Sequence, residues 1–289
     1  MECITTSYIM ELQQSLLYQA YIKALHWNVV TIDGAAVFYR KIPFIGTLAK
    51  LQRPAHLPYL PKFIMELKKL GIRQISVEPR ETTSQEVFSS YLYSLSKFFR
   101  ILKTPFIPTK TIIIDLTLSE HDIFSRFTSA KRRAVRRAEK NDLRVVESHN
   151  INDLISIKSK AAGLFGGITT HGIDRLWKLV YPQYATILLA QIDHKKTIAG
   201  ILLLFWNKTT YYWVAGATRK GKKLFAPTLL VWHALKVGKK KKCTQFDFIG
   251  VWDERKPHQF PEWKGFTKFK EGFGGKPLYY PITDPGALS

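Results

Sequence analysis

The sequence predicts a duplicated α+β architecture, in which two copies of the same order of strands, helix and strand follow each other along the chain. Two observations support this prediction. The second half contains three apolar runs of strand length joined by short polar turns, followed by a helical stretch and a further apolar run. The first half repeats this order more weakly, with little residue identity between the copies. We expect mixed, mostly antiparallel sheets flanked by helices.

The second copy gives the clearest signals. Its first three runs are rich in β-branched and aromatic residues, and the turns between them have hairpin length, which predicts an antiparallel meander. These runs are 185–192, 197–206 and 210–217. A basic loop at 218–223 leads into helical spacing over 225–238, where Pro227 suits a first turn and Gly238 a helix end. The run at 244–251 predicts a buried strand.

The first copy follows the same order. Asp33 and Gly34 separate two apolar runs and form a strong signal for a type I′ hairpin. The predicted strands are 27–32, 35–41, 47–53 and 73–79, with a helix at 63–70. Between the two copies, we predict strands at 109–118 and 143–147 and helices at 119–127 and 129–141.

Composition indicates a globular protein with a strong positive field. The chain has 289 residues, 46% of them hydrophobic, and a formal net charge of +22. This apolar content excludes a disordered basic tail, and two cysteines, Cys3 and Cys243, exclude a disulfide framework. The longest apolar run is shorter than a membrane helix and the N-terminal residues lack an export signal, so we expect a cytoplasmic protein. The field attracts nucleic acid, phosphorylated substrates or an anionic membrane surface.

The predicted helix 129–141 carries the densest positive charge. Its basic residues cover one broad face, opposite Ala134 and Val135. They are Arg132, Arg133, Arg136, Arg137 and Lys140. Such a run is often only a solvated surface, but no acid interrupts it before Glu139, so its repulsion is largely uncompensated. We therefore expect a polyanion to bind this face.

Several classes of site lack support in the sequence. The eight histidines have no metal-ligand spacing, so no metal site is expected. A serine-hydrolase elbow, a cysteine–histidine pairing and the glycine-rich phosphate loops are also absent.

The C-terminal stretch is different, because it places charged groups among aromatic ones. Phe266, Phe269 and Phe273 have the spacing of a helix core face. That spacing accounts for the phenylalanines but not for Lys270, which directly follows Phe269. Lys270 is therefore a candidate cation at a reaction centre, and Asp247 is an acid on the preceding buried strand.

Four stretches resemble the FemAB (FemXAB) family of non-ribosomal peptidyl and aminoacyl transferases, which build the interpeptide bridges of peptidoglycan. They are 12–27, 108–145, 166–180 and the closing segment 246–275, whose GFTKFKEGFGG motif is the most specific. The resemblance implies two tandem acetyltransferase-like (GNAT) subdomains, which we place at 1–147 and 148–289. The chain is shorter than most members and lacks the coiled-coil arm that some carry.

The resemblance implies transfer of an amino acid from aminoacyl-tRNA to an amine on the stem peptide of a UDP-linked or lipid-linked muropeptide, with no further cofactor. The attack places negative charge on the carbonyl oxygen, so the reaction needs an oxyanion stabiliser and a proton acceptor. By resemblance, Lys270 stabilises the oxyanion with Phe269 packed beside it. Glu78 is the first candidate for the proton acceptor and Asp247 the second.

The resemblance also implies binding positions. Lys23 and Arg175 match residues that bind the diphosphate and sugar-nucleotide end of the muropeptide, and Trp27 lies in the same opening segment as Lys23. The basic face of helix 129–141 would bind tRNA or the substrate phosphates. We expect a monomer that contacts an anionic membrane surface peripherally.

Two other classes of function remain open. An acyl-CoA-dependent acetyltransferase would use the loop 218–223 to bind a pyrophosphate through backbone N–H groups. The loop has the right position but only one glycine, Gly221, and the lysines at 222 and 223 crowd it. A non-catalytic nucleic-acid-binding protein would require the charge alone, although the lysine run 239–242 is better explained as a solvated turn.

Overall fold

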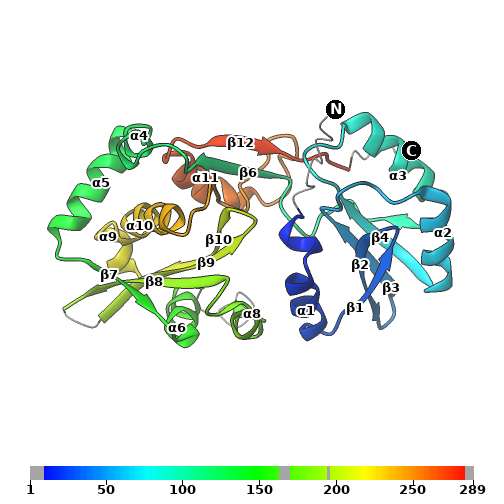
Figure 1. Ribbon diagram of the computed structural model, residues 1–289, viewed down its shortest axis with the longest axis horizontal. Coiled ribbons are helices and arrows are strands. Elements are labelled where there is room, and N and C mark those ends of the chain that lie inside the picture. Colours follow the sequence, from blue (N-terminus) through cyan, green and yellow to red (C-terminus); the bar gives the residue numbers. More distant parts are fainter. Residues whose placement is uncertain (1–9, 163–169, 194–195, 284–289) are drawn as a thin grey trace, which may run out of the picture. The chain divides into compact units, whose positions relative to one another are not determined.

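The computed structural model describes residues 10–162, 170–193 and 196–283 (Figure 1). The described residues divide into two compact units, one formed by residues up to 110 together with 278–283 and the other by those between 111 and 277. Each unit contains a mixed sheet flanked by helices, which confirms the predicted fold class. In the described part of the chain, none of the helices combines the length and the apolarity required to cross a membrane.

The first unit is built on a five-stranded sheet of order β1-β2-β3-β4-β5. Its strands are β1 (Asn28–Ile32), β2 (Ala35–Ile42), β3 (Gly46–Gln52), β4 (Ile72–Glu78) and β5 (Arg100–Ile101). Its helices are η1 (Leu12–Gln14), α1 (Leu16–Ala24), α2 (Leu60–Lys69) and α3 (Gln85–Ser96). The first three strands are antiparallel, and β3, β4 and β5 are parallel. The hairpin between β1 and β2 has positive φ at Asp33 and Gly34, as its sequence predicts.

The two faces of this sheet differ. On one face of the sheet, strand side chains and side chains of helices α2 and α3 form an apolar core. Its members include Ala49, Leu51, Phe63, Leu67, Ile75, Phe88 and Leu92. Side chains alternate along a strand, so Lys50 and Gln52 point to the opposite face. Phe38 on β2 and Ser76 on β4 lie in register with Lys50, and Gln52 is paired with Glu78. The polar side chains of Lys50, Gln52, Ser76 and Glu78 therefore lie together on the second face of the sheet.

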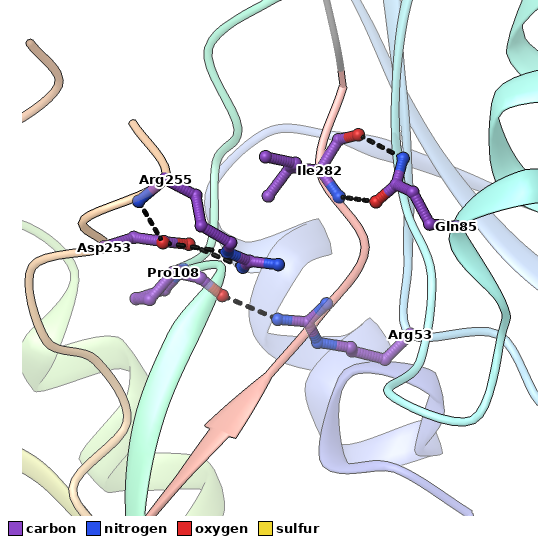
Figure 2. A network of polar contacts seen from close by, with 6 residues as sticks. All are labelled: Arg53, Gln85, Pro108, Asp253, Arg255 and Ile282. Carbon is purple, nitrogen blue, oxygen red and sulfur yellow. Dashed lines mark hydrogen bonds and ion pairs between the residues drawn. The ribbon is translucent and has the colours of Figure 1, made fainter. Parts of the chain in front are cut away.

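The last described residues pack on the first unit, as Figure 2 shows. The side chain of Gln85 donates a hydrogen bond to the carbonyl oxygen of Ile282 (2.9 Å) and accepts one from its backbone N–H (3.0 Å). The Arg53 guanidinium donates to the carbonyl oxygen of Pro108 (2.7 Å), and its Cζ lies 3.2 Å from the centroid of the Tyr280 ring. These contacts explain why the C-terminal residues belong to the first unit.

The second unit is built on a seven-stranded sheet of order β12-β6-β11-β10-β9-β8-β7. Its strands are β6 (Lys110–Asp115), β7 (Arg144–Ser148), β8 (Ala185–Ile192), β9 (Lys196–Trp206), β10 (Thr209–Ala217), β11 (Gln245–Asp247) and β12 (Lys276–Tyr279). Its helices are α4 (Glu120–Ser125), α5 (Ser129–Lys140), α6 (Ile151–Ala162), α8 (Ile173–Val180), α9 (Arg219–Lys223), α10 (Ala226–Lys240), η3 (Pro261–Trp263) and α11 (Lys264–Glu271). Helices α5 and α10 pack on one face of β8 and β9, and α6 lies on the other (Figure 1).

The two units share one topology. The succession β1-β2-β3-α2-β4 corresponds to β8-β9-β10-α10-β11, and in each copy the helix connects the third strand to a parallel fourth strand. The duplication predicted from the apolar runs is therefore confirmed. The segment between the copies supplies β6, which pairs with β11, and β7, which pairs with β8. Because both strands join the second sheet, the units divide at residue 110, whereas the sequence placed the boundary at 147.

Two predicted elements differ from the structure. The strand predicted at 244–251 ends at Asp247, because Ile249 has a φ of +66° and the N–H of Gly250 turns back to donate to the carbonyl oxygen of Phe248 (2.8 Å). The segment predicted as a loop at 218–223 contains a short helix, α9, which Thr218 caps. Helices α3, α6 and α8 were not predicted.

Candidate active-site residues

Lys270 is held in a fixed position near the end of α11. Its ammonium donates hydrogen bonds to the carbonyl oxygens of Phe248 (2.9 Å) and Gly250 (2.6 Å). These oxygens flank Ile249, whose positive φ is rare for a β-branched residue and turns the chain so that both point at the lysine. An ammonium has three N–H donors, so one has no partner among the described residues.

The surroundings of Lys270 are largely apolar. Its Nζ lies 4.9 Å from the centroid of the Phe266 ring and 5.7 Å from that of Tyr212. Burial lowers the pKa of Lys270 to about 8, and the nearby Asp247 carboxylate opposes that shift. Burial also raises the pKa of the Tyr212 phenol. Lys270 thus lies among aromatic side chains of the second unit, and its role at a reaction centre stays a prediction.

Asp247 lies at the end of β11 and is 8% exposed. Its Oδ1 accepts hydrogen bonds from the Thr111 hydroxyl (2.5 Å) and from the backbone N–H of Ile249 (2.6 Å). The carboxylate therefore orients the turn that presents carbonyl oxygens to Lys270. This contact gives Asp247 a structural task, and its role as a proton acceptor stays a prediction.

Phe269 packs between a second buried lysine and the core. Its ring lies 5.2 Å from the Phe273 ring in an edge-to-face contact, and the Lys131 ammonium lies 3.6 Å from the Phe269 centroid. Burial lowers the pKa of Lys131 to about 8. The N–H of Thr128 donates to the carbonyl oxygen of Gly272 (2.9 Å), so the start of α5 is joined to the end of α11. Lys131 belongs to the basic run but was not singled out in the sequence.

Ahead of Lys270, three aromatic rings form a partly exposed row. Phe260 stacks on Trp263 at 4.8 Å between centroids, and Trp263 lies 5.2 Å from Phe266. Phe260 is 38% exposed and Phe266 37% exposed. The preceding loop is stiffened by Asp253, whose carboxylate accepts hydrogen bonds from the Arg255 side chain at 2.9 and 2.6 Å (Figure 2). The spacing that predicted a core face therefore buries Phe273 but leaves Phe266 at the surface.

Helix α5 presents most of its predicted basic residues to solvent. Arg133, Arg136, Arg137 and Lys140 are exposed, and the opposite face is buried through Ala134, Val135 and Ala138. Arg132 differs, because its guanidinium donates to the carbonyl oxygens of Ser125 (2.8 Å) and Phe127. Arg132 therefore holds the connection between α4 and α5.

In the first unit, Glu78 is buried at the end of β4 and fully engaged. Its Oε1 accepts hydrogen bonds from the Ser76 hydroxyl (2.7 Å) and the backbone N–H of Phe106 (2.6 Å), and its Oε2 accepts one from the Gln52 amide (2.9 Å). These three donors hold the carboxylate in one orientation. Its predicted role as proton acceptor is untested.

Beside Glu78 lies Lys50, which sequence reasoning missed. Lys50 is 6% exposed, and its Nζ lies 4.3 Å from the centroid of the Trp27 ring, 5.3 Å from Phe106 and 5.7 Å from Phe38. Burial lowers the pKa of Lys50 to about 8, and Glu78 opposes the shift. A lysine at an alternating position of a strand that is otherwise buried was the signal available in the sequence. The predicted residues Trp27 and Glu78 thus surround a cation.

The remaining predicted binding residues lie in different units. Lys23 is exposed in the last turn of α1 in the first unit, and Arg175 is half-buried on α8 in the second. The matching motif around Arg175 begins in residues 166–169, which lie outside the described residues.

Residues of two other basic segments make contacts within the protein. Gly221 in α9 donates its N–H to the Thr218 hydroxyl (3.0 Å), and a Cβ on this glycine would meet the carbonyl oxygen of Ile198. This glycine therefore serves close packing, which weakens the case for a pyrophosphate loop. Lys239 donates to the carbonyl oxygens of Leu116 (2.8 Å) and Leu118. Over the described ranges, no cluster of histidine, cysteine and acidic side chains has the arrangement of a metal site.

Comparison with known proteins finds one matching family model. Residues 182–278, which include Asp247, Phe269 and Lys270, match the model of the FemAB family. No curated protein matches the sequence.

Solved structures show the same fold at low identity. The chain is similar to the crystal structure of FemX, with a TM-score of 0.72, 16% identity and coverage of 94% of this chain and 91% of that one. It is also similar to the C-terminal domain of a putative lysylphosphatidylglycerol synthetase from Agrobacterium fabrum, with a TM-score of 0.60, 13% identity and coverage of 98% and 92%. A tandem GNAT protein from the clavulanic acid biosynthesis pathway has a TM-score of 0.53, 10% identity and coverage of 85% and 76%.

Proposed function

We propose that this FemAB-family protein, with its GNAT-like fold, is an aminoacyltransferase that moves an amino acid from aminoacyl-tRNA to an amine of a peptidoglycan-precursor stem peptide. The observation that carries the proposal is the position of Lys270. Its ammonium is fixed by two backbone carbonyl oxygens, among aromatic side chains within the residues that match the family.

The proposed chemistry uses the remaining N–H of Lys270. The acceptor amine attacks the carbonyl carbon of the aminoacyl ester, a C–N bond forms, and the electron pair of the C=O bond moves to the oxygen. Lys270 donates a hydrogen bond to that oxyanion, which is strongest in a site that excludes water. Collapse of the intermediate breaks the ester C–O bond, and the proton lost by the amine ends on the ribose hydroxyl of the released tRNA.

The pKa of Lys270 suits this role. With a pKa of about 8, the side chain is mostly an ammonium at neutral pH and can neutralise the developing charge. The two carbonyl oxygens prevent it from rotating toward solvent, so no reorganisation is needed when the oxyanion forms. Phe269 and Phe273 maintain the packing behind it.

Two surfaces of the second unit suit the donor. The exposed arginines of α5 would contact phosphates, and the row of Phe260, Trp263 and Phe266 would stack unpaired bases of the tRNA 3′ end. The row leads to Lys270, since Phe266 lies beside its ammonium. We assign the acceptor, a UDP- or lipid-linked muropeptide, to the first unit, where Lys23 and Trp27 lie, with no cofactor besides the two substrates.

The test is a transfer reaction with separate donors. Purified protein is incubated with a mixture of charged tRNAs and a UDP-linked muropeptide, and the acceptor mass is measured. A mass increase of one aminoacyl residue is expected. In a parallel reaction, acetyl-CoA replaces the charged tRNAs. Acetylation without any aminoacylation would refute the proposal and favour the acetyltransferase alternative.

A further inference from the structure

The clearest unused group is the cation buried on the polar face of the first sheet. Lys50 is only 6% exposed. None of the described residues accepts a hydrogen bond from its ammonium. Its Nζ lies 4.3 Å from the centroid of the Trp27 ring, 5.3 Å from that of Phe106 and 5.7 Å from that of Phe38. Burial of most of a lysine side chain desolvates its ammonium at a cost, so an apolar residue would be expected here if packing were the only requirement.

Glu78 does not supply the missing acceptor. Both of its oxygens already accept hydrogen bonds from Ser76, Gln52 and the backbone of Phe106. Its charge favours the ammonium form of Lys50, but no ion pair forms between them. The same hydrogen bond to Phe106 fixes the loop that carries this ring over the lysine. Glu78 therefore keeps Lys50 charged and its aromatic cover in place, while the N–H donors of Lys50 stay unused.

The cover is open to solvent on one side. Phe106 is 45% exposed and Trp27 is half-buried, with their rings in an edge-to-face contact at 6.2 Å. A ligand can therefore approach along these rings and place an anionic group against the ammonium. Aromatic side chains of this kind bind the apolar part of a ligand while the cation binds its charge.

We propose that Lys50 is the anion-binding residue of a ligand site in the first unit, where it donates hydrogen bonds to a carboxylate or phosphate of a small molecule that packs on Trp27 and Phe106. If the proposed function holds, this ligand is the acceptor substrate, and Lys50 is a specificity residue for it. The site itself rests on the first unit alone and does not require the transfer reaction.

Binding is measured by calorimetry on the full chain without tRNA. The probes are a UDP-linked muropeptide, a short peptide with a free C-terminal carboxylate, the same peptide as its amide, and inorganic diphosphate. Variants are Lys50→Met and, as a matched control, Lys41→Met, which removes an exposed lysine from the neighbouring strand β2. A thermal melt establishes that both variants are folded.

We expect Lys50→Met to raise the Kd of the muropeptide at least tenfold and Lys41→Met to change it less than twofold. If the anion is a carboxylate, the free peptide binds, its amide does not, and only the free peptide is sensitive to Lys50→Met. If it is a phosphate, diphosphate shows that sensitivity instead. Equal affinity of Lys50→Met and the parent for every probe, or no binding of any probe by the parent, would overturn the site. Lys50-dependent binding without any aminoacyl transfer would instead refute the proposed function alone.

Discussion

The two units contain the same pair of charges in different settings. In each unit, the strand after the crossing helix ends in a buried acid, Glu78 on β4 and Asp247 on β11, and a lysine whose pKa is lowered by burial lies near it. Burial lowers the pKa of both Lys50 and Lys270 to about 8. The difference lies in hydrogen bonding, because Lys270 has two carbonyl acceptors and Lys50 has no hydrogen-bond acceptor among the described residues.

This difference teaches what each lysine is built for. Lys270 is oriented before any ligand arrives, as a group must be that stabilises a transient charge. Lys50 has a fixed location but no fixed hydrogen bonds, as expected for a group that a ligand completes. The same shift in pKa thus accompanies two different tasks, and the pattern of acceptors separates them.

The largest expected effect is that of Lys270→Met on the transfer reaction. Loss of a preorganised donor to an oxyanion lowers kcat by roughly 10²–10³-fold. Single-turnover kinetics with charged tRNA would measure it. The control is Lys268→Met, which removes an exposed lysine from the same helix and should change kcat less than twofold. If the kcat of Lys270→Met stayed within a few-fold of the parent value, Lys270 would not be the oxyanion stabiliser that distinguishes it from Lys50.

Removing the acid of the first unit should cost stability. Glu78→Ala leaves the donors of Ser76, Gln52 and Phe106 without an acceptor, so the free energy of unfolding should fall by about 3 kcal/mol. Urea denaturation measures this change. Glu86→Ala, at an exposed position of α3, should stay within about 0.5 kcal/mol of the parent. An equal loss of unfolding free energy in the two variants would contradict the role of these three hydrogen bonds in stability.

The sequence predicted the strands and turns around both sites better than the side-chain contacts within them. Runs such as 185–192 and the Asp33-Gly34 turn depend on local patterns, and the structure contains them as β8 and the first hairpin. The turn after Asp247 could not be predicted, because a β-branched residue at positive φ contradicts its own local preference and is held by contacts with Thr111 and Lys270. Such an exception to local preference is expected where a site is built.

Lys50 shows a second limit of the sequence. Its position in an otherwise apolar strand is only a weak local signal, since its burial depends on Trp27 and Phe106, which are distant in the chain. Lys270 was found because its aromatic neighbours lie beside it in sequence. The resemblance to the family supplied Trp27 and Glu78 without revealing the lysine between them.

The two lysines should also differ in their effect on stability. Lys50→Met replaces a cation that burial desolvates by an apolar side chain of similar length, so the free energy of unfolding at pH 7 should rise by about 1–2 kcal/mol. Lys270→Met should bring no such gain, because it leaves the carbonyl oxygens of Phe248 and Gly250 without their donor. Urea denaturation of the two variants and the parent at pH 7 measures both effects.

The stability difference between Lys50→Met and the parent should depend on pH in a defined direction. The pKa of Lys50 is about 8 in the folded chain and about 10.4 when unfolded, so between these values the unfolded chain binds more protons. Stability therefore rises with pH from about 8 to about 10.4 in the parent. The advantage of Lys50→Met should be complete below pH 8 and disappear as the pH approaches 10.4. An advantage that did not change over this range would show that Lys50 is not desolvated in the folded chain.

The smallest expected effects concern the basic helix, where the same distinction between satisfied and unsatisfied cations applies. Arg136 and Arg137 are exposed, so each Arg→Gln substitution should lower tRNA affinity several-fold and reduce the slope of log K against log salt by about 0.7–0.9. Arg132→Gln should leave the slope unchanged and lower the melting temperature instead, because this guanidinium already binds the carbonyl oxygens of Ser125 and Phe127. Filter binding between 50 and 200 mM salt, a range over which phosphate contacts weaken strongly, measures the slopes. Identical slopes for Arg132→Gln and Arg137→Gln would mean that acceptors within the protein do not determine which cations are available to the nucleic acid.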